Sequence, residues 1–71
     1  MLIHLPDENF HTFDLVRLVR SACDQLSDLG VQNYVHQTDE VSCWVELVDL
    51  AITVTPEIDF PAKGIRFNLP E

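Results

Sequence analysis

The chain has 71 residues, and twelve acidic side chains against four basic ones give it a formal net charge of −8. A surface this negative repels nucleic-acid phosphates and anionic lipids and attracts basic proteins, so we expect no direct nucleic-acid binding and no membrane association. The hydrophobic fraction of 46% is too high for the disordered acidic class. The length allows a single domain, residues 1–71, with a small core.

No segment has the features of a secretory signal or a membrane span. Met1–Leu5 is apolar but short, and Pro6 follows at once. No apolar run approaches the roughly 18 residues that a bilayer requires. Two cysteines, Cys23 and Cys43, allow at most one internal disulfide. We therefore expect a cytoplasmic protein in which both thiols are reduced and buried as small hydrophobic groups.

A short strand and a long helix are the first predicted elements. The apolar run Met1–Leu5 favours a strand that Pro6 ends. A helix is predicted over about Phe13–Leu29, with the hydroxyl of Thr12 as N-cap and Gly30 as the left-handed residue that ends it. Apolar residues at helical spacing form one stripe, which we expect to face the core: Leu15, Leu18, Val19, Ala22, Leu26 and Leu29.

After the helix the hydrophobic period changes to two, which predicts strands. Val31–Thr38 predicts one strand and Asp39–Glu40 a tight turn, and the next strand begins at Val41. Apolar and polar residues alternate along that second strand, so its two faces differ. One face holds Val41, Cys43, Val45 and Leu47, and the other holds Ser42, Trp44 and Glu46.

The alternation changes phase near Val48 and Asp49, with no glycine or proline nearby. Two explanations remain open, a β-bulge within one strand or a corner between two strands. We expect Pro56 to end the apolar run and Glu57–Gly64 to form a loop. Ile65–Leu69 alternates cleanly and predicts a last short strand.

The β-α-β-β-β order predicts a small two-layer α+β domain, with one helix packed on a mostly antiparallel sheet of about four strands. One helix covers one face of such a sheet, yet Tyr34 and Trp44 have the opposite parity from Val35 and Val45. Three explanations are open: a loop returns over the second face, the aromatic rings are partly exposed, or that face is an interface. We favour the interface, because Trp and Tyr are effective anchors in binding.

No motif indicates a metal or catalytic site. The histidines and cysteines carry ligand atoms, but no zinc-type spacing such as C-x₂-C or H-x₃-H occurs. Acidic pairs such as Asp7–Glu8 lack the alternating ligands and glycine of a calcium loop. Cys23 and His36 could form a nucleophilic pair, but Cys23 lies mid-helix, away from the helix N-terminus that would lower its pKa. We therefore predict no cofactor, no metal and no catalytic residue.

The acidic surface has two interpretations. Negative charge can maintain solubility and prevent association of strand edges. Alternatively, carboxylates along one face imitate a phosphate backbone and occupy the basic groove of a nucleic-acid-binding protein. The predicted contact residues are six acids and two aromatic residues: Asp24, Asp28, Tyr34, Asp39, Glu40, Trp44, Glu46 and Asp49.

The favoured function is a non-catalytic binding protein that inhibits or modulates a larger protein with a basic surface. Small acidic proteins of this type occur among phage and mobile-element inhibitors, such as anti-CRISPR and immunity proteins, which is an analogy of type and not of motif. We also expect a homodimer, formed through the uncovered face or an edge strand. Two alternatives stay open: a homo-oligomeric structural or assembly subunit, and a small His/Cys metal-binding protein or enzyme.

Overall fold

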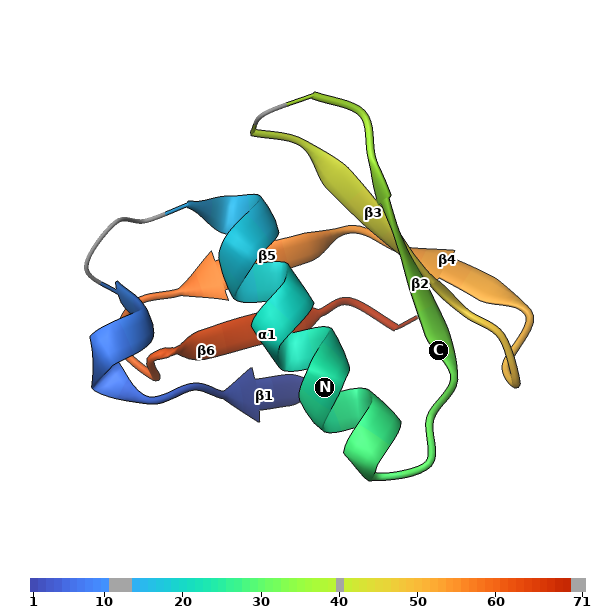
Figure 1. The fold of residues 1–71 in the computed structure, drawn as a ribbon, viewed down its shortest axis with the longest axis horizontal. Coiled ribbons are helices and arrows are strands. Elements are labelled where there is room, and N and C mark those ends of the chain that lie inside the picture. Colours follow the sequence, from blue (N-terminus) through green and yellow to red (C-terminus); the bar gives the residue numbers. More distant parts are fainter. Residues whose placement is uncertain (11–13, 40, 70–71) are drawn as a thin grey trace.

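The computed structural model describes residues 1–10, 14–39 and 41–69. Over these ranges the chain forms six strands, one α-helix and one short 3-10 helix, coloured in chain order in Figure 1. The predicted α+β class is confirmed, with six strands in place of about four. In sequence order the elements are β1 (Leu2–His4), η1 (Asp7–Phe10), α1 (Leu15–Asp28), β2 (Asn33–Gln37), β3 (Cys43–Leu47), β4 (Ile52–Val54), β5 (Pro56–Asp59) and β6 (Gly64–Phe67).

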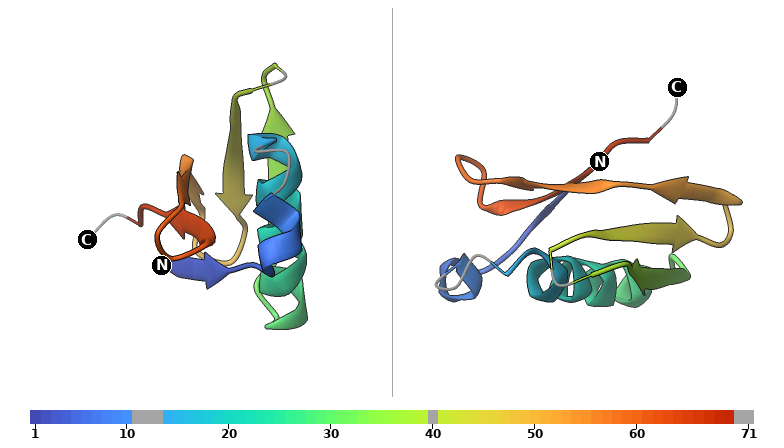
Figure 2. Two further views of the ribbon diagram at one scale, coloured as in Figure 1. Left: turned by 90° about the vertical axis from the view of Figure 1, so that its left-hand side faces the viewer. Right: turned by 90° about the horizontal axis from the view of Figure 1, so that it is seen from above.

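Within the described ranges the strands form two antiparallel sheets of three strands each, in the orders β1-β6-β5 and β2-β3-β4. Only Thr55 separates β4 from β5, so one nearly continuous stretch of chain runs from one sheet into the other. The right-hand view of Figure 2 shows this stretch above β3, with β2 and α1 below. The helix packs against β2 of one sheet and against β1 and β6 of the other.

Asp14 sets the start of α1. Its Oδ1 accepts a hydrogen bond from the backbone N–H of Arg17 at 3.2 Å, and its own backbone is extended, as is usual for an N-cap residue. Because Asp14 is the cap, the helix begins two residues later than the predicted start at Phe13. The expected cap, Thr12, lies outside the described residues, as does Phe13.

Gly30 ends α1 as predicted, with a φ of +85° in the left-handed region that glycine adopts readily. The backbone N–H groups of Gly30 and Val31 donate to the carbonyls of Ser27 and Leu26, at 3.0 Å and 2.8 Å. These bonds satisfy carbonyls that are otherwise unpaired at a helix end. Leu29, predicted in the apolar stripe, is the C-cap residue and is 73% exposed.

No helix in the described ranges is long and apolar enough to cross a membrane.

One core lies between α1 and the two sheets. The apolar stripe of the helix is buried largely as predicted, but Leu15 is only half-buried, and Val16 and Cys23 are buried in addition. Each large apolar side chain removed from water stabilises the fold by roughly 1.5–3 kcal/mol. The buried set comprises Ile3, Leu5, Val16, Leu18, Val19, Ala22, Cys23, Leu26, Cys43, Val45, Leu47, Val54, Ile65 and Phe67.

The phase change near Val48 is a corner between two strands, so the alternative of a β-bulge is wrong. β3 ends at Leu47, and β4 begins at Ile52 and returns antiparallel to it. The turn between them is closed by the N–H of Ala51, which donates to the carbonyl of Val48 at 3.1 Å. Ala51 has a φ of +53°, which costs about 1 kcal/mol for a residue with a Cβ. Leu50 lies in this turn and is 56% exposed.

Pro56 begins a strand instead of ending the sheet. The predicted loop over Glu57–Gly64 is therefore wrong in its first part, which forms β5 and pairs with β6. Pro56 stands opposite Phe67 at the first position of β5, where a missing backbone N–H is tolerated. A short turn then leads into β6, so the last predicted strand is present, but it spans Gly64–Phe67 and not Ile65–Leu69.

Candidate functional site

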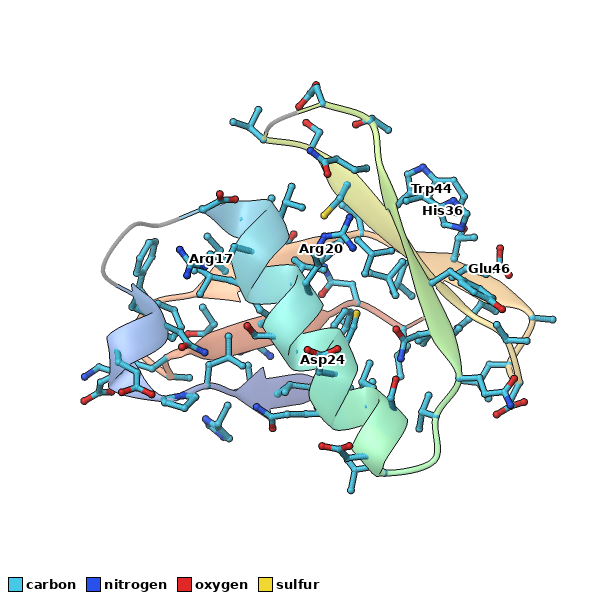
Figure 3. All side chains as sticks on the ribbon, in the orientation of Figure 1. Arg17, Arg20, Asp24, His36, Trp44 and Glu46 are labelled. Carbon is cyan, nitrogen blue, oxygen red and sulfur yellow. The ribbon has the colours of Figure 1, made fainter. Side chains whose placement is uncertain are left out.

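The sheet β2-β3-β4 has one face in the core and the other in solvent. Along β3, Cys43, Val45 and Leu47 are buried. Trp44 and Glu46 alternate with them and are half-buried on the opposite face, as the sequence predicted. Figure 3 shows both side chains on the side of the β2–β3 hairpin that points away from α1.

The strand register places five side chains next to one another on this outer face. Glu46 pairs with Tyr34 of β2 and with Thr53 of β4, while Trp44 pairs with His36 of β2. Cross-strand partners point to the same face with Cβ atoms about 4.5–5.5 Å apart. Glu46 is thus at the centre of the group. We call this surface the aromatic–acidic face: Tyr34, His36, Trp44, Glu46 and Thr53.

The imidazole of His36 lies flat on the indole of Trp44, with ring centroids 3.8 Å apart and ring planes within 9° of each other. His36 Nε2 is 3.6 Å from Glu46 Oε1, which is beyond hydrogen-bond distance. This nitrogen is covered and makes no hydrogen bond to the described residues. The stack covers one face of the indole, and Tyr34, on the neighbouring strand β2, is 63% exposed.

A hollow of about 310 Å³ adjoins Glu46 on the β4 side of this face. Three of its five lining residues are aliphatic, and the full set is Glu46, Val48, Ala51, Ile52 and Thr53. The side chain of Glu46 is 40% exposed, so a group in the hollow can reach its carboxylate. An aliphatic hollow with one carboxylate suits a group that has an apolar stem and a positive end.

Most of the predicted acidic contact residues lie away from this face. Asp24 and Asp28 are exposed on α1. Asp39 is exposed in the turn before β3, and Asp49 in the turn after it. Glu40 lies outside the described residues. Of the predicted contact residues, the structure brings together Tyr34, Trp44 and Glu46.

His36 and Thr53 are not among the contact residues predicted from the sequence. His36 shares the parity of Tyr34, and it lies as far before position 40 as Trp44 lies after it. This symmetric spacing about the turn was the available signal for His36. Thr53 could be placed only once the phase change was known to be a corner, because the corner fixes which residue of β4 stands opposite Glu46.

A second hollow, a groove of about 730 Å³, runs between α1 and the β2–β3 hairpin. Arg17 and Arg20 line it and form no ion pair with the carboxylates that the structure describes. Asp14 and Asp24 line it as well, and Figure 3 shows Arg17, Arg20 and Asp24 along α1. Two positive and two negative side chains leave the groove near neutral, so it offers no clear preference for a charged ligand.

Both cysteines are free and buried, as predicted. Burial raises the pKa of Cys23 from its ordinary value of 9.0 to about 11, with smaller contributions from Cys43 and Asp24. Burial also raises the pKa of Cys43. Cys23 lies in the core and His36 on the outer face, so they do not form the nucleophilic pair considered from the sequence. Among the described residues, no group of three or more His, Cys, Asp and Glu side chains could hold a metal ion.

Comparisons with protein-family models, curated proteins and solved structures give no match for the chain.

Proposed function

We propose that this chain is a small non-catalytic binding protein that inhibits or modulates a larger protein through its aromatic–acidic face. The observation that carries the proposal is the grouping of Tyr34, Trp44 and Glu46 on one solvent-facing side of a sheet whose other side closes the core. Aromatic residues of this kind dominate the binding energy of many protein interfaces.

The stacked His36 supports this role for Trp44. A side chain that must become ordered on binding lowers affinity by about 0.5–1.5 kcal/mol. The imidazole is already stacked on the indole, with ring centroids 3.8 Å apart. The indole should therefore lose less conformational entropy when the partner binds. Tyr34 is 63% exposed and adds a ring that the partner can bury. The face therefore combines one fixed aromatic group with one that is open to solvent.

The charge of the chain favours a partner with a basic surface. The net charge of −8 attracts positive surfaces and repels phosphates. Of the predicted acidic contacts that the structure describes, only Glu46 lies on the aromatic–acidic face. The remaining acids are spread over α1 and the turns, so we assign them to long-range attraction and not to imitation of a nucleic-acid backbone.

The state of the thiols supports a role without catalysis. A thiolate, not a thiol, is the nucleophile in cysteine chemistry. Burial keeps the pKa of Cys23 near 11 and raises that of Cys43, so at neutral pH both are protonated. The most reactive side chains of the sequence are thus placed in the core as packing groups.

The proposal is tested by affinity capture from the native host, comparing the parent with Tyr34→Ala and Trp44→Ala. We expect the same protein to be retained by the parent and lost from both variants. Phe60→Ala is the matched control, because Phe60 is an aromatic residue that is 51% exposed in the β5–β6 turn. Retention by all four proteins, or loss from the control as well, would contradict the proposal.

Self-association through the same sheet is the second candidate. β2 is the outer strand of its sheet and carries the exposed Tyr34, so a second copy could pair with it. Light scattering at micromolar concentration should then give a mass above the 8.1 kDa of one chain. A mass of 8.1 kDa would remove this candidate and leave the face free for another protein.

A further inference from the structure

The charge and shape of the aromatic–acidic face point to the group that it recognises. We propose that it binds an arginine side chain of the partner, with the guanidinium on the carboxylate of Glu46 and the aliphatic stem in the adjoining hollow. This inference rests on the proposed function and adds the chemical identity of the recognised group.

Glu46 is available for such a contact. The lysine and arginine side chains that form ion pairs within the described ranges use Asp7 and Asp59, and neither acid is on this face. The group paired with Glu46 is the imidazole of His36, whose Nε2 is 3.6 Å from Oε1. That distance leaves both carboxylate oxygens free to accept hydrogen bonds from an incoming donor. With 40% of its side chain exposed, Glu46 can be reached without rearranging the sheet.

The hollow beside Glu46 has the size and lining for the stem of one side chain. Its volume of about 310 Å³ is at the lower end of the range for small-molecule sites. Its lining residues are three aliphatic ones, Val48, Ala51 and Ile52, and two polar ones, Glu46 and Thr53. Long basic side chains bury their methylene groups on apolar surface while the charged end stays at a polar site. The lining of the hollow matches that distribution.

Arginine fits the face better than lysine. A guanidinium donates two parallel hydrogen bonds to one carboxylate and also stacks on an aromatic ring. Tyr34 stands directly opposite Glu46 in the register, and its ring is open to solvent. A planar cation on Glu46 can therefore lie against this ring and gain the attraction between a cation and the ring face. A lysine ammonium is a point charge and uses only the carboxylate.

Other ligand classes fit less well. A phosphate or carboxylate ligand would meet Glu46 and the field of a chain with a net charge of −8. A metal ion would need a set of ligands, and none is present among the described residues. The remaining class is an organic cation with an apolar stem, which in a protein partner is a basic side chain.

The test uses N-acetyl-arginine amide as the probe. Trp44 is the one tryptophan in the sequence, so its fluorescence reports on the face directly. We expect a saturable fluorescence change, with shifts of the backbone amide signals of Tyr34, Glu46 and Thr53 in nitrogen-15 spectra. N-acetyl-citrulline amide has nearly the same shape without the charge. Its affinity should be lower than that of the arginine probe by a factor of about ten or more. N-acetyl-lysine amide should also bind more weakly than the arginine probe.

Two variants complete the experiment. Glu46→Gln should lower the affinity for the arginine probe about tenfold and remove the preference for arginine over citrulline. Glu57→Gln makes the same change at an exposed position on β5, in the other sheet, and should leave the affinity unchanged. Equal binding of citrulline or lysine, full affinity in Glu46→Gln, or no saturable response to the arginine probe would each overturn the inference.

The capture experiment separates this inference from the proposed function. If Tyr34→Ala and Trp44→Ala lose the partner while the arginine probe gives no saturable response, the binding function stands and the assignment of an arginine is wrong. If the probe binds at Glu46 but no captured protein depends on Tyr34 or Trp44, the guanidinium site stands and the proposed function fails.

Discussion

A single carboxylate fixes where α1 begins. Asp14 Oδ1 satisfies the N–H of Arg17, one of the backbone donors that a helix leaves unpaired in its first turn. Asp14→Ala should therefore lower the free energy of unfolding by about 1 kcal/mol, whereas Asp14→Asn keeps an acceptor and should remain close to the parent. Urea unfolding of the three proteins measures the difference. Equal stability of the alanine variant and the parent would show that Asp14 is not the cap.

The two thiols allow a prediction at the same scale. A rise in the pKa of Cys23 from 9.0 to about 11 reduces its thiolate fraction about a hundredfold at neutral pH. Alkylation by iodoacetamide should thus be much slower in the folded chain than in urea. The double variant Cys23→Ala, Cys43→Ala should still fold. Its free energy of unfolding should fall only because the smaller side chains pack less well in the core. Fast alkylation of both thiols in the folded state would contradict their burial.

The direction of the pKa shift also sets the pH dependence. Because the pKa of Cys23 is raised on folding, its protonated form stabilises the folded state below pH 9.0, and this contribution is lost as the pH rises from 9.0 to about 11. The parent should therefore lose more stability than Cys23→Ala across this window. Thermal unfolding at several pH values measures it, and parallel curves for the two proteins would show that the thiol does not contribute.

Among the elements, α1 holds the two sheets together. Leu18 and Leu26 are almost completely buried in the core between α1 and the sheets, whereas Leu29 is 73% exposed near the same helix end as Leu26. Leu18→Ala or Leu26→Ala should lower the free energy of unfolding by about 2–5 kcal/mol, because each leaves a cavity in the core. Leu29→Ala is the matched control and should change it by about 0.5 kcal/mol or less. Comparable losses in all three variants would mean that the buried face of α1 is assigned wrongly.

The helix and the β2–β3 hairpin could be predicted because their hydrophobic periods are local properties. Residues that repeat at helical spacing, or that alternate, must share a face wherever the element lies. The start of α1 was predicted two residues too early, with Thr12 as the cap, because Thr and Asp are both common N-cap residues and the sequence does not show that Asp14 accepts from Arg17. Sequence patterns thus identified the elements better than their boundaries.

Strand β5 was not predicted, because it is defined by its pairing with β6 and not by a pattern within its own residues. A proline usually ends a strand, and only the pairing of Pro56 with Phe67 shows that this one begins a strand. Gly64 was assigned to a loop for the same reason. In the structure a Cβ at Gly64 would lie 2.3 Å from the carbonyl oxygen of Ile3, so the glycine is needed where β1 and β6 meet. That contact joins residues from the two ends of the chain.

The candidate site was predictable in part for related reasons. Alternation along β3 placed Trp44 and Glu46 on the outer face, and parity placed Tyr34 there as well. The acids of α1 could not be related to that face, because the sequence does not give the orientation of the helix on the sheet. Asp24 and Asp28 are on a different element and are exposed separately.

For the whole molecule, charge and aromatic contact are divided between different surfaces. The net charge of −8 comes from side chains distributed over helix, turns and strands, and it acts at a distance of about 8–10 Å at moderate salt. The aromatic–acidic face, through which we propose that the partner binds, lies on the outer side of β2-β3-β4. The distributed acids should therefore affect how fast a basic partner arrives, and the aromatic group should affect how long it stays.

Two variants separate these contributions. The double variant Asp24→Asn, Asp28→Asn removes two charges from α1, away from the aromatic–acidic face. It should slow association with the captured partner and weaken the dependence of that rate on salt, with the dissociation rate unchanged. Trp44→Ala should leave association nearly unchanged and speed dissociation, with a loss of about 2 kcal/mol or more in binding free energy.

Binding kinetics on the immobilised partner at low and high ionic strength distinguish the two effects. The control is Glu57→Gln, which removes one exposed charge from β5; it should slow association less than the double variant does and should also leave the dissociation rate unchanged. A faster dissociation of the Asp24→Asn, Asp28→Asn variant would place α1 inside the interface. If Trp44→Ala dissociates no faster than the parent, the partner binds elsewhere, because removal of a desolvated aromatic anchor must shorten the lifetime of any complex built on it.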